Sequence, residues 1–321
     1  MNMPVVAATL FALALFSAGA AQSQPWAPTK AARIVVPSSA GGAPDTFARI
    51  YADELQKAFG QPFVVDNKPG AAGIIGTDAV AKAPPDGATL LYGFNSAVTM
   101  NPHLYKKIPY NAARDLTPVA LVLSGGYILL ANNDFPVSNV RGLISLAKSK
   151  PGELNYGSSG SGSAGHLGML LLEQAADIKM THIPYKQAAI SDLIAGQIQV
   201  LIEPAASAVP QVKAGRVKAL AVTGSARVEA LPNVPTVAET IPNYDLSGWN
   251  GFWLPAGTPE SIVYRYQQEI ARITLLPVVA TRAKELAYRQ MLGTPQEMAD
   301  RIFRESKTWG DLIKQHNITL D

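Results

Sequence analysis

A strand, a loop and a helix in immediate succession, residues 33–49 (RIVVPSSAGGAPDTFAR), constrain the fold of this chain more than any other stretch. The β-branched run IVV predicts a buried strand, and the apolar spacing after Asp45 predicts a helix that ends near Phe59. Helix N-termini present unpaired N–H groups and the positive end of the helix dipole, and Gly41 and Gly42 carry no side chain to keep a ligand away. The junction therefore predicts an anion-binding loop.

The same order of elements recurs at residues 154–170 (LNYGSSGSGSAGHLGML). The loop of this second junction adds four hydroxyl groups, those of Ser158, Ser159, Ser161 and Ser163. Hydroxyl groups and backbone N–H groups both donate hydrogen bonds to the oxygen atoms of an anion. We expect the two loops to face one another across a cleft.

Strands and helices alternate in both halves of the sequence, which predicts α/β structure. A third strand is expected at residues 88–93, and Asn95 and Ser96 follow it. If the sheet is parallel, these two residues lie at the same sheet edge as the opening loop, where ligands of open α/β sheets bind. The sequence therefore places Asn95 and Ser96 beside the expected anion site.

Two acidic residues, one at an expected helix start and one at an expected strand end, can each be assigned more than one role. Asp45 is expected to be a helix N-cap or a first-turn acid, because aspartate is favoured at both places. There it would also hold the loop at residues 38–44 so that the N–H groups of the loop meet a ligand. Glu203 follows a strand in the second half of the chain. It either orients a lysine or a ligand amine or caps the next turn, and the residues alone do not choose between these roles.

Two stretches predict crossings between the halves. Residues 115–132 have the pattern of two apolar strands separated by the Ser-Gly-Gly sequence at 124–126, and the aromatic-rich residues 231–259 contain a return strand. Three helices are expected after Pro259, the second of them over residues 277–289. We therefore expect a first domain at 30–125 and 248–321 and a second domain at 126–247.

The N-terminus has the pattern of an export signal. An apolar run from Pro4 to Ala21 ends in small residues, with Ala18 and Ala20 in an A-x-A arrangement, and it predicts a signal peptide over residues 1–23. The alternative is an N-terminal membrane anchor. Since the chain has no cysteine, a disulfide framework, a thiolate metal site and lipid attachment through cysteine are excluded.

Several function classes find little support. A net charge of +3 without a Lys/Arg-rich run argues against a nucleic-acid partner, and four isolated histidines do not predict a metal site. Gly160, Gly162 and Gly165 fit G-x-G-x-x-G, yet the next strand offers no acid for a ribose hydroxyl. No loop serine fits G-x-S-x-G, and His166 and His182 are expected to hydrogen-bond backbone groups rather than activate a serine. We expect no catalytic residue, cofactor or metal.

Seven ordered blocks of this sequence resemble one protein family. They are AGGAPDTFAR (40–49), VVDNKPGAAGIIGTDAVAKAPPDGATLL (64–91), NPHLYKKIPYN (101–111), YGSSGSGSAGHL (156–167), HIPYK (182–186), LPNVPTVAE (231–239) and LPAGTP (254–259). With these blocks the chain resembles the periplasmic substrate-binding proteins of tripartite tricarboxylate transporters, the Bug family.

The resemblance implies a fold and a role. The fold is a two-domain, type II-like periplasmic-binding-protein fold of the α/β class, with crossing hinge strands and a ligand cleft between the domains. The role is capture of a small organic acid, a di- or tricarboxylate or an aromatic acid, in the periplasm by a monomer that delivers it to membrane transporter subunits. The candidate ligand-binding residues are Ser39, Gly41, Gly42, Ala43, Asp45, Asn95, Ser96, Ser158, Ser159, Ser161, Ser163 and Glu203.

One departure and two alternatives accompany the resemblance. After Lys186 the family commonly continues with Gly and a Pro-containing segment, whereas this chain reads QAAISDL and is about two residues shorter, which alters the distal end of the expected pocket. Tyr127 and Trp249 either stack on an aryl acid or serve as hinge packing. The rival functions are an exported hydrolase that uses Ser161 or Ser163 with His166 as base, and a sensory protein that presents the same ligand to a receptor.

Overall fold

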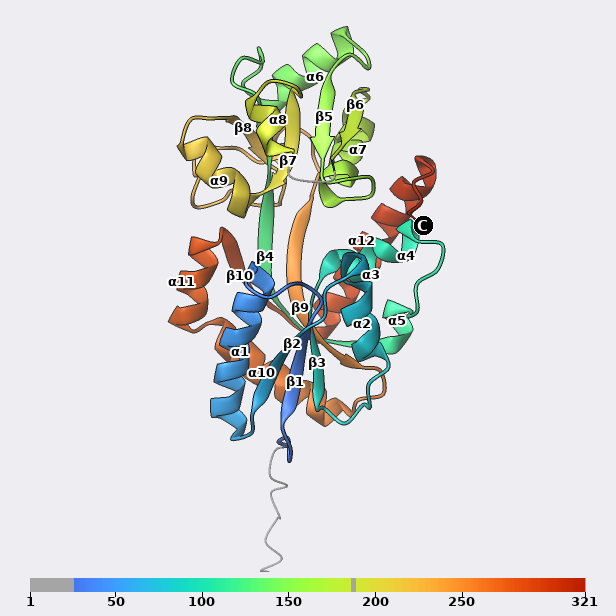
Figure 1. Cartoon of the computed structure of the whole chain (residues 1–321), viewed down its shortest axis with the longest axis vertical. Coiled ribbons are helices and arrows are strands. Elements are labelled where there is room, and N and C mark those ends of the chain that lie inside the picture. The colour runs from blue at the N-terminus through green and yellow to red at the C-terminus, as the bar shows by residue number, and fades with distance from the viewer. Residues whose placement is uncertain (1–25, 186–188, 321) are drawn as a thin grey trace, which may run out of the picture.

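The computed structural model describes residues 26–185 and 189–320 (Figure 1). The expected signal peptide at 1–23 and the start of the altered segment at 186–188 therefore lie outside the described residues. Within the described ranges, no helix has the length and apolar character needed to cross a membrane.

The first domain, built around β1, β2 and β3, follows the expected alternation. Its elements up to the first crossing are β1 (Ala32–Val36), α1 (Ala43–Phe59), β2 (Phe63–Asn67), η1 (Ala71–Gly73), α2 (Ile74–Ala81), β3 (Thr89–Phe94), α3 (Asn95–Thr99), α4 (Asn101–Leu104) and α5 (Ala112–Asp115). β1 pairs in parallel with both β2 and β3. Their apolar side chains are buried because α1 covers one face of the sheet; Phe47, Tyr51 and Leu55 of α1 have no exposed surface. The carboxyl ends of these strands share one edge, as the sequence predicts.

The second domain, built around β5 to β8, repeats the arrangement. Its elements are α6 (Val140–Ser149), β5 (Asn155–Ser158), α7 (Ala164–Ala176), β6 (Thr181–Pro184), α8 (Ile190–Ile194), β7 (Val200–Pro204), α9 (Ala205–Lys213) and β8 (Lys218–Val222), followed by η2 (Val237–Glu239). β5 pairs in parallel with β6 and β7. The α/β class and the two-domain fold expected from the sequence are confirmed.

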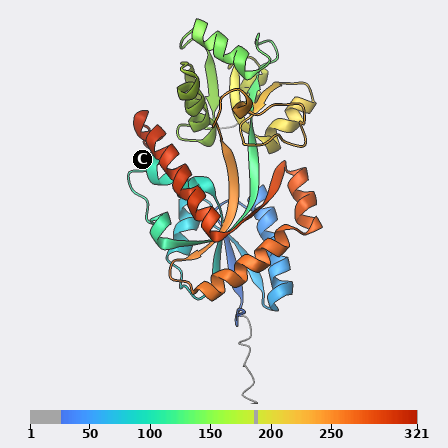
Figure 2. The same cartoon turned by 180° about the vertical axis from the view of Figure 1, so that it is seen from behind.

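Two long strands, β4 (Leu116–Ala131) and β9 (Ser247–Pro255), connect the domains. They run antiparallel up the middle of the molecule (Figures 1 and 2), and β4 continues upward to pair with β7 and β8. A single ten-stranded sheet results, in the order β2-β1-β3-β9-β4-β7-β5-β6, with β8 and β10 also paired to β4. The expected crossing strands are therefore present.

The expected break of the first crossing at residues 124–126 is wrong, because β4 is one continuous strand of 16 residues. A Cβ atom on Gly125 would lie 2.8 Å from the ring of Tyr288 on the neighbouring strand. Glycine at this position thus makes room for an aromatic ring against the sheet instead of ending the strand. Sequence patterns do not distinguish these two uses of glycine.

The C-terminal region contains a strand that the pattern did not predict. α10 (Glu260–Thr274), α11 (Pro277–Glu285) and α12 (Pro295–Gln315) are helical as expected, but β10 (Tyr288–Gly293) begins where the second helix was expected to continue. The helix stops because the chain turns through Ala287, whose φ is 57°. β10 then pairs antiparallel with β4, so the pairing with a distant strand overrides the local helical pattern.

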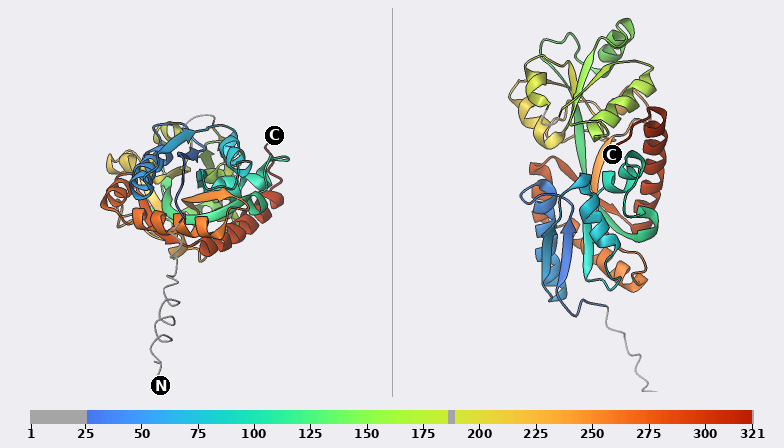
Figure 3. Two further views of the ribbon diagram at one scale, coloured as in Figure 1. Left: turned by 90° about the horizontal axis from the view of Figure 1, so that it is seen from below. Right: turned by 45° about the vertical axis from the view of Figure 1, so that its right-hand side comes forward.

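α12 links the two domains a second time. A capping box between Thr294 and Glu297 starts the helix. Its last turns bring Trp309, Leu312 and Ile313 into the core that contains α7 of the second domain. Figure 2 and the right-hand view of Figure 3 show α12 rising from the first domain along the side of the molecule. The C-terminal helix therefore packs on both domains, and the domain limits at 125/126 and 247/248 stay a prediction.

Candidate functional site

Two adjoining cavities lie between the domains and together form what we call the interdomain cleft. Their volumes are about 210 and 270 Å³, and both are lined by Asn95, Ser96, Tyr127 and Pro204. Asn95 and Ser96 come from the first domain, Pro204 comes from the second, and Tyr127 comes from the crossing strand β4. A molecule held in the cleft would therefore contact both domains at once.

The loop between β1 and α1, the first of the two expected anion-binding loops, is held in shape by Asp45. Gly42 is the N-cap of α1, and the Asp45 carboxylate accepts hydrogen bonds from the Gly41 N–H group at 2.9 Å and from Arg49 at 3.1 Å. Gly41 has a φ of 85°, which favours glycine. Burial raises the pKa of Asp45, but the hydrogen bonds from Arg49, Gly41 and Asn67 outweigh it, so the pKa lies below its usual range. Asp45 therefore stays ionised and orders the loop, as its first-turn position predicts.

The same loop lies at the rim of the interdomain cleft. Ser39, Gly41 and Gly42 are exposed, and of residues 39–45 Pro44 lines the smaller cavity. Within the described part of the chain, the N–H groups of Gly42 and Ala43 donate to no protein acceptor. They are the first donors of a 17-residue helix. The loop thus offers two N–H groups beside the cleft.

The second loop is held by a histidine. Ser163 is the N-cap of α7, and the Gly162 N–H group donates to Nδ1 of His166 at 3.0 Å. Ser159 and Ser163 line the larger cavity, whereas Ser161 is exposed and does not line it. The expectation that His166 fixes the loop agrees with this geometry.

Ser158 is not at the cleft. Its side chain has no exposed surface. Its hydroxyl group hydrogen-bonds to the backbone carbonyl and N–H groups of Gly160 and to Nε2 of His182, the last at 2.7 Å. The Ser158 side chain points into the domain core, so its hydroxyl group cannot meet a ligand in the cleft. Its hydrogen bonds to Gly160 stabilise the turn of the loop instead. The contact with His182 does not make a nucleophile, since a fully buried hydroxyl cannot reach a substrate.

His166 makes the stability of the second loop depend on pH. Burial, with smaller effects of His182 and His316, lowers its pKa to about 4, and neutral Nδ1 is the acceptor that Gly162 needs. The unfolded chain binds this proton near pH 6.5, so the contribution is complete above pH 6.5 and is lost as the pH falls toward 4. We expect the melting temperature of the parent to fall over this range, and less so in His166→Gln, whose amide oxygen can accept the same bond. Equal slopes in circular dichroism melts would contradict this assignment.

Asn95 joins the first domain to the hinge. It begins α3 directly after β3, and its amide donates to the carbonyl of Ser247 at 3.1 Å and to Glu305 at 3.3 Å, while the N–H group of Trp249 donates to its oxygen at 3.4 Å. Asn95 therefore positions strand β9 and the cleft floor together. Ser96, the next residue, is only half-buried in the cleft.

The larger cavity is also lined by residues that were not among the candidate ligand-binding residues, among them Ala72, Asn101, Tyr127 and Ser247. Asn101 is buried and donates to the carbonyl of Ala72 at 3.0 Å, which fixes a turn whose φ at Ala72 is 52°. Tyr127 lines both cavities, and burial, Tyr288 and Glu203 raise its pKa to about 12, so its hydroxyl stays a donor. The Gly-Ala-Ala-Gly sequence at residues 70–73 is the signal that could have pointed to this turn.

Glu203 lines the larger cavity as expected. It is half-buried at the end of β7, and Ser207 of α9 donates to its Oε1 atom at 2.6 Å. Burial raises the pKa of Glu203, and the bond from Ser207 opposes this effect. The bond from Ser207 therefore helps to keep the Glu203 side chain ionised against the effect of burial.

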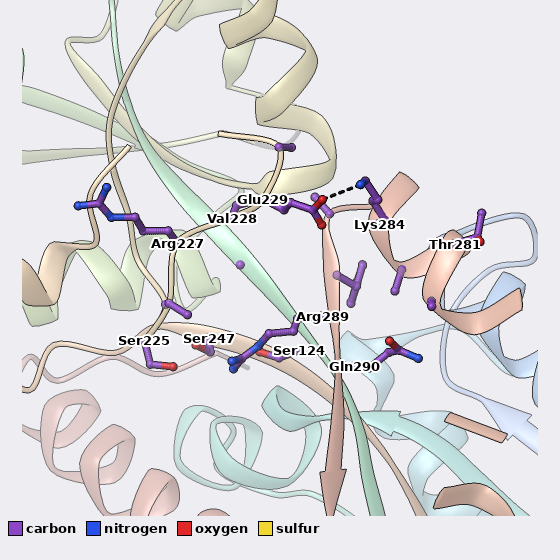
Figure 4. A pocket seen from close by; sticks show the side chains of 18 residues that line it. Ser124, Ser225, Arg227, Val228, Glu229, Ser247, Thr281, Lys284, Arg289 and Gln290 are labelled. Carbon is purple, nitrogen blue, oxygen red and sulfur yellow. Dashed lines mark hydrogen bonds and ion pairs between the residues drawn. The ribbon is translucent and has the colours of Figure 1, made fainter. Parts of the chain in front are cut away.

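A third and larger cavity, of about 490 Å³, lies on the other face of β4 (Figure 4). Ser124 lines it, and Gly126 lines both this cavity and the interdomain cleft, whereas Gly125 and Tyr127 line the cleft. Three basic side chains, Arg227, Lys284 and Arg289, also line this cavity, and Lys284 pairs with Glu229 at 2.6 Å. None of the candidate residues from the sequence lines it.

Comparison with known proteins gives a consistent result over most of the chain. Residues 47–318 match the model of the tripartite tricarboxylate transporter family receptor. A UPF0065 protein in the tcbD-tcbE intergenic region of Pseudomonas sp. (strain P51) is 35% identical over 298 residues, which cover 92% of this chain and 88% of that protein.

Solved structures agree in sequence and in shape. R. palustris Rpa4515 with adipate is 33% identical, with a TM-score of 0.75 over 91% of this chain and 99% of that one. MatC (Rpa3494) from Rhodopseudomonas palustris with bound malate is 32% identical, with a TM-score of 0.71 over 89% of this chain and 99% of that one.

Proposed function

The chain belongs to the tripartite tricarboxylate transporter receptor family, whose members are periplasmic solute-binding receptors, and from this premise we propose that it captures a small organic carboxylate in the periplasm for a membrane transporter. The observation that carries the proposal is the interdomain cleft, which lies beside two helix N-termini and is lined by neutral donors from both domains. The relatives with adipate and malate support the same chemical class.

Capture requires closure of the cleft. The first loop lies at the rim, so bending of β4 and β9 where they cross between the domains would bring Gly42 and Ala43 toward Ser159 and Ser163. N–H and hydroxyl groups from both sides would then replace the hydration of one carboxylate. Because the ligand makes these contacts together only in the closed state, its binding favours closure, and the transporter can distinguish loaded from empty protein.

The proposal assigns no chemistry to the protein. Ser158, whose hydroxyl contacts His182, is fully buried, and His166 is engaged as an acceptor for Gly162. A sensory protein would use the same cleft, and it differs only in the partner that reads the closed form. We propose a monomeric carrier without cofactor or metal.

A thermal-shift screen of the exported protein tests the proposal. Mono-, di- and tricarboxylates, aromatic acids and amino acids are added in turn, and a ligand at 100 times its Kd is expected to stabilise the protein by about 2.7 kcal/mol, or roughly 5 to 10 °C. A shift with one class of acid supports capture of that class. Absence of any shift, together with no acid released from denatured protein in mass spectrometry, would refute carboxylate binding.

A further inference from the structure

An ion pair bridges the two halves of the molecule on the face of β4 that lies away from the interdomain cleft. Lys284 lies in the last turn of α11, and Glu229 lies in the loop at residues 224–230, which follows β8. The Nζ atom of Lys284 is 2.6 Å from Oε1 of Glu229 (Figure 4). Both residues line the cavity of about 490 Å³, which we call the back cavity.

The two partners of this pair are attached to different parts of β4. α11 leads into β10, which pairs with β4 at residues 121–125, whereas β8 pairs with β4 at residues 128–131. The bend proposed for closure of the cleft falls between these two pairings. Such a bend therefore moves Glu229 relative to Lys284.

The position of the pair determines the direction of this movement. Ser124 lines the back cavity and Tyr127 lines the cleft, so β4 forms a wall between the two spaces. When two bodies close on one side of a hinge, they move apart on the other side. In the structure the first loop is exposed at residues 39–42, so the cleft is open while the ion pair is intact. Closure is therefore expected to break the pair.

The pair is weak enough for a ligand to break it. The two side chains are 69% and 72% exposed. An exposed ion pair shifts an equilibrium by about two- to fivefold. When the open form predominates, the apparent affinity is the affinity of the closed form reduced by the closed fraction. A contact that exists only in the open form therefore lowers the apparent affinity by the same factor.

We propose that the Lys284–Glu229 pair stabilises the open form of the receptor and breaks on closure, so that two residues outside the cleft set its affinity. The inference rests on the proposed function, because it assumes that the protein captures a carboxylate by closing. Its distinctive consequence is that loss of a contact on the back of the hinge makes binding tighter.

Isothermal titration of the full exported protein with malate, adipate, citrate, benzoate and glutamate tests the inference. Glu229→Gln should bind the acid that the parent binds about two- to fivefold more tightly. Glu229→Lys and Lys284→Glu change the net charge in opposite directions, yet both should raise the affinity, because each places like charges together in the open form. Both reversals in one protein restore an ion pair and should return the affinity to that of the parent.

A pair within one helix provides the matched control. Lys307 and Asp311 of α12 form an ion pair of similar exposure at 2.7 Å, and Asp311→Lys should leave the affinity unchanged. Opposite effects of the two single reversals would mean that net charge alone acts on the anionic acid, and this result would overturn the inference. Unchanged affinity in all the Glu229 and Lys284 variants would also overturn it, and both results leave the proposed function intact. No binding of any of the five acids by the parent would remove the proposed function and the inference together.

A covalent link across the back cavity tests the same movement with a larger effect. The chain has no cysteine, so Glu229→Cys with Lys284→Cys carries two thiols that a short bis-maleimide can join. Because the link keeps the two positions together, we expect the joined protein to lose affinity about tenfold or more. The same variant with both thiols capped by N-ethylmaleimide should bind at least as tightly as the parent. Equal affinities of the joined and capped proteins would show that closure does not separate the pair.

Discussion

Gly42→Val is expected to weaken carboxylate binding about a hundredfold while the protein stays folded. Gly42 has a φ of −80° and a ψ of 173°, an extended conformation that valine adopts readily, and a Cβ atom there would meet only Pro44 and Ser39, at 3.7 and 3.8 Å. The fold therefore accepts the side chain. Its methyl groups would cover the N–H groups of Gly42 and Ala43, and the loss of two hydrogen bonds to a charged ligand costs about 3 kcal/mol.

Gly42→Ala separates this steric effect from the capping effect. Alanine and valine are both poorer N-caps than glycine, so each should lower the stability of α1 by up to about 1 kcal/mol. Only valine has the branch that blocks the carboxylate, so the alanine variant should keep most of the affinity. Titration calorimetry on parent and variants, with the acid found by the thermal-shift screen, measures the difference. If Gly42→Val binds as tightly as the parent, the first loop does not hold the ligand.

Trp249→Ala is expected to cause the largest loss of stability among the substitutions considered, about 3 to 5 kcal/mol, which corresponds to a drop on the order of 10 °C in the melting temperature. Trp249 is 1% exposed on the hinge strand β9 and stacks on Trp253 at 5.8 Å between ring centroids. Its indole N–H group donates to both carboxylate oxygens of Glu305, at 2.9 and 3.0 Å. Alanine would leave a cavity and would remove one hydrogen-bond donor from the partly buried carboxylate of Glu305.

Two control variants separate these contributions in denaturant unfolding. Trp249→Phe keeps most of the buried ring but removes the donor, so its loss should lie near 1 to 3 kcal/mol. Phe303→Ala removes an aromatic ring that is 75% exposed on α12, the helix that also carries Glu305, and should change the free energy of unfolding by at most about 0.5 kcal/mol. Equal losses in Trp249→Ala and Phe303→Ala would show that the hinge does not depend on this packing.

The sequence predicted most of the elements because their signals are local. The β-branched strand, the small-residue loop and the helix of residues 33–49 appear as β1 and α1, with the helix starting two residues earlier, at Ala43. Asp45 and His166 hold their loops, as their positions beside a helix N-terminus suggest. Helix starts and buried strands depend on neighbouring residues, so one sequence is enough to find them.

What only the tertiary structure decided depends on residues far apart in the chain. β4 is continuous because Gly125 accommodates the ring of Tyr288, and the strand that begins at Tyr288 forms because β4 offers an unpaired edge. Ser158 points into the domain core although it belongs to the same serine-rich loop as Ser159. The sequence by itself determined the α/β elements, the two strand-loop-helix junctions and the family resemblance. The folded chain decided which donors face the cleft and that Glu203 is its acidic group, because these facts follow from how the two domains meet at β4 and β9.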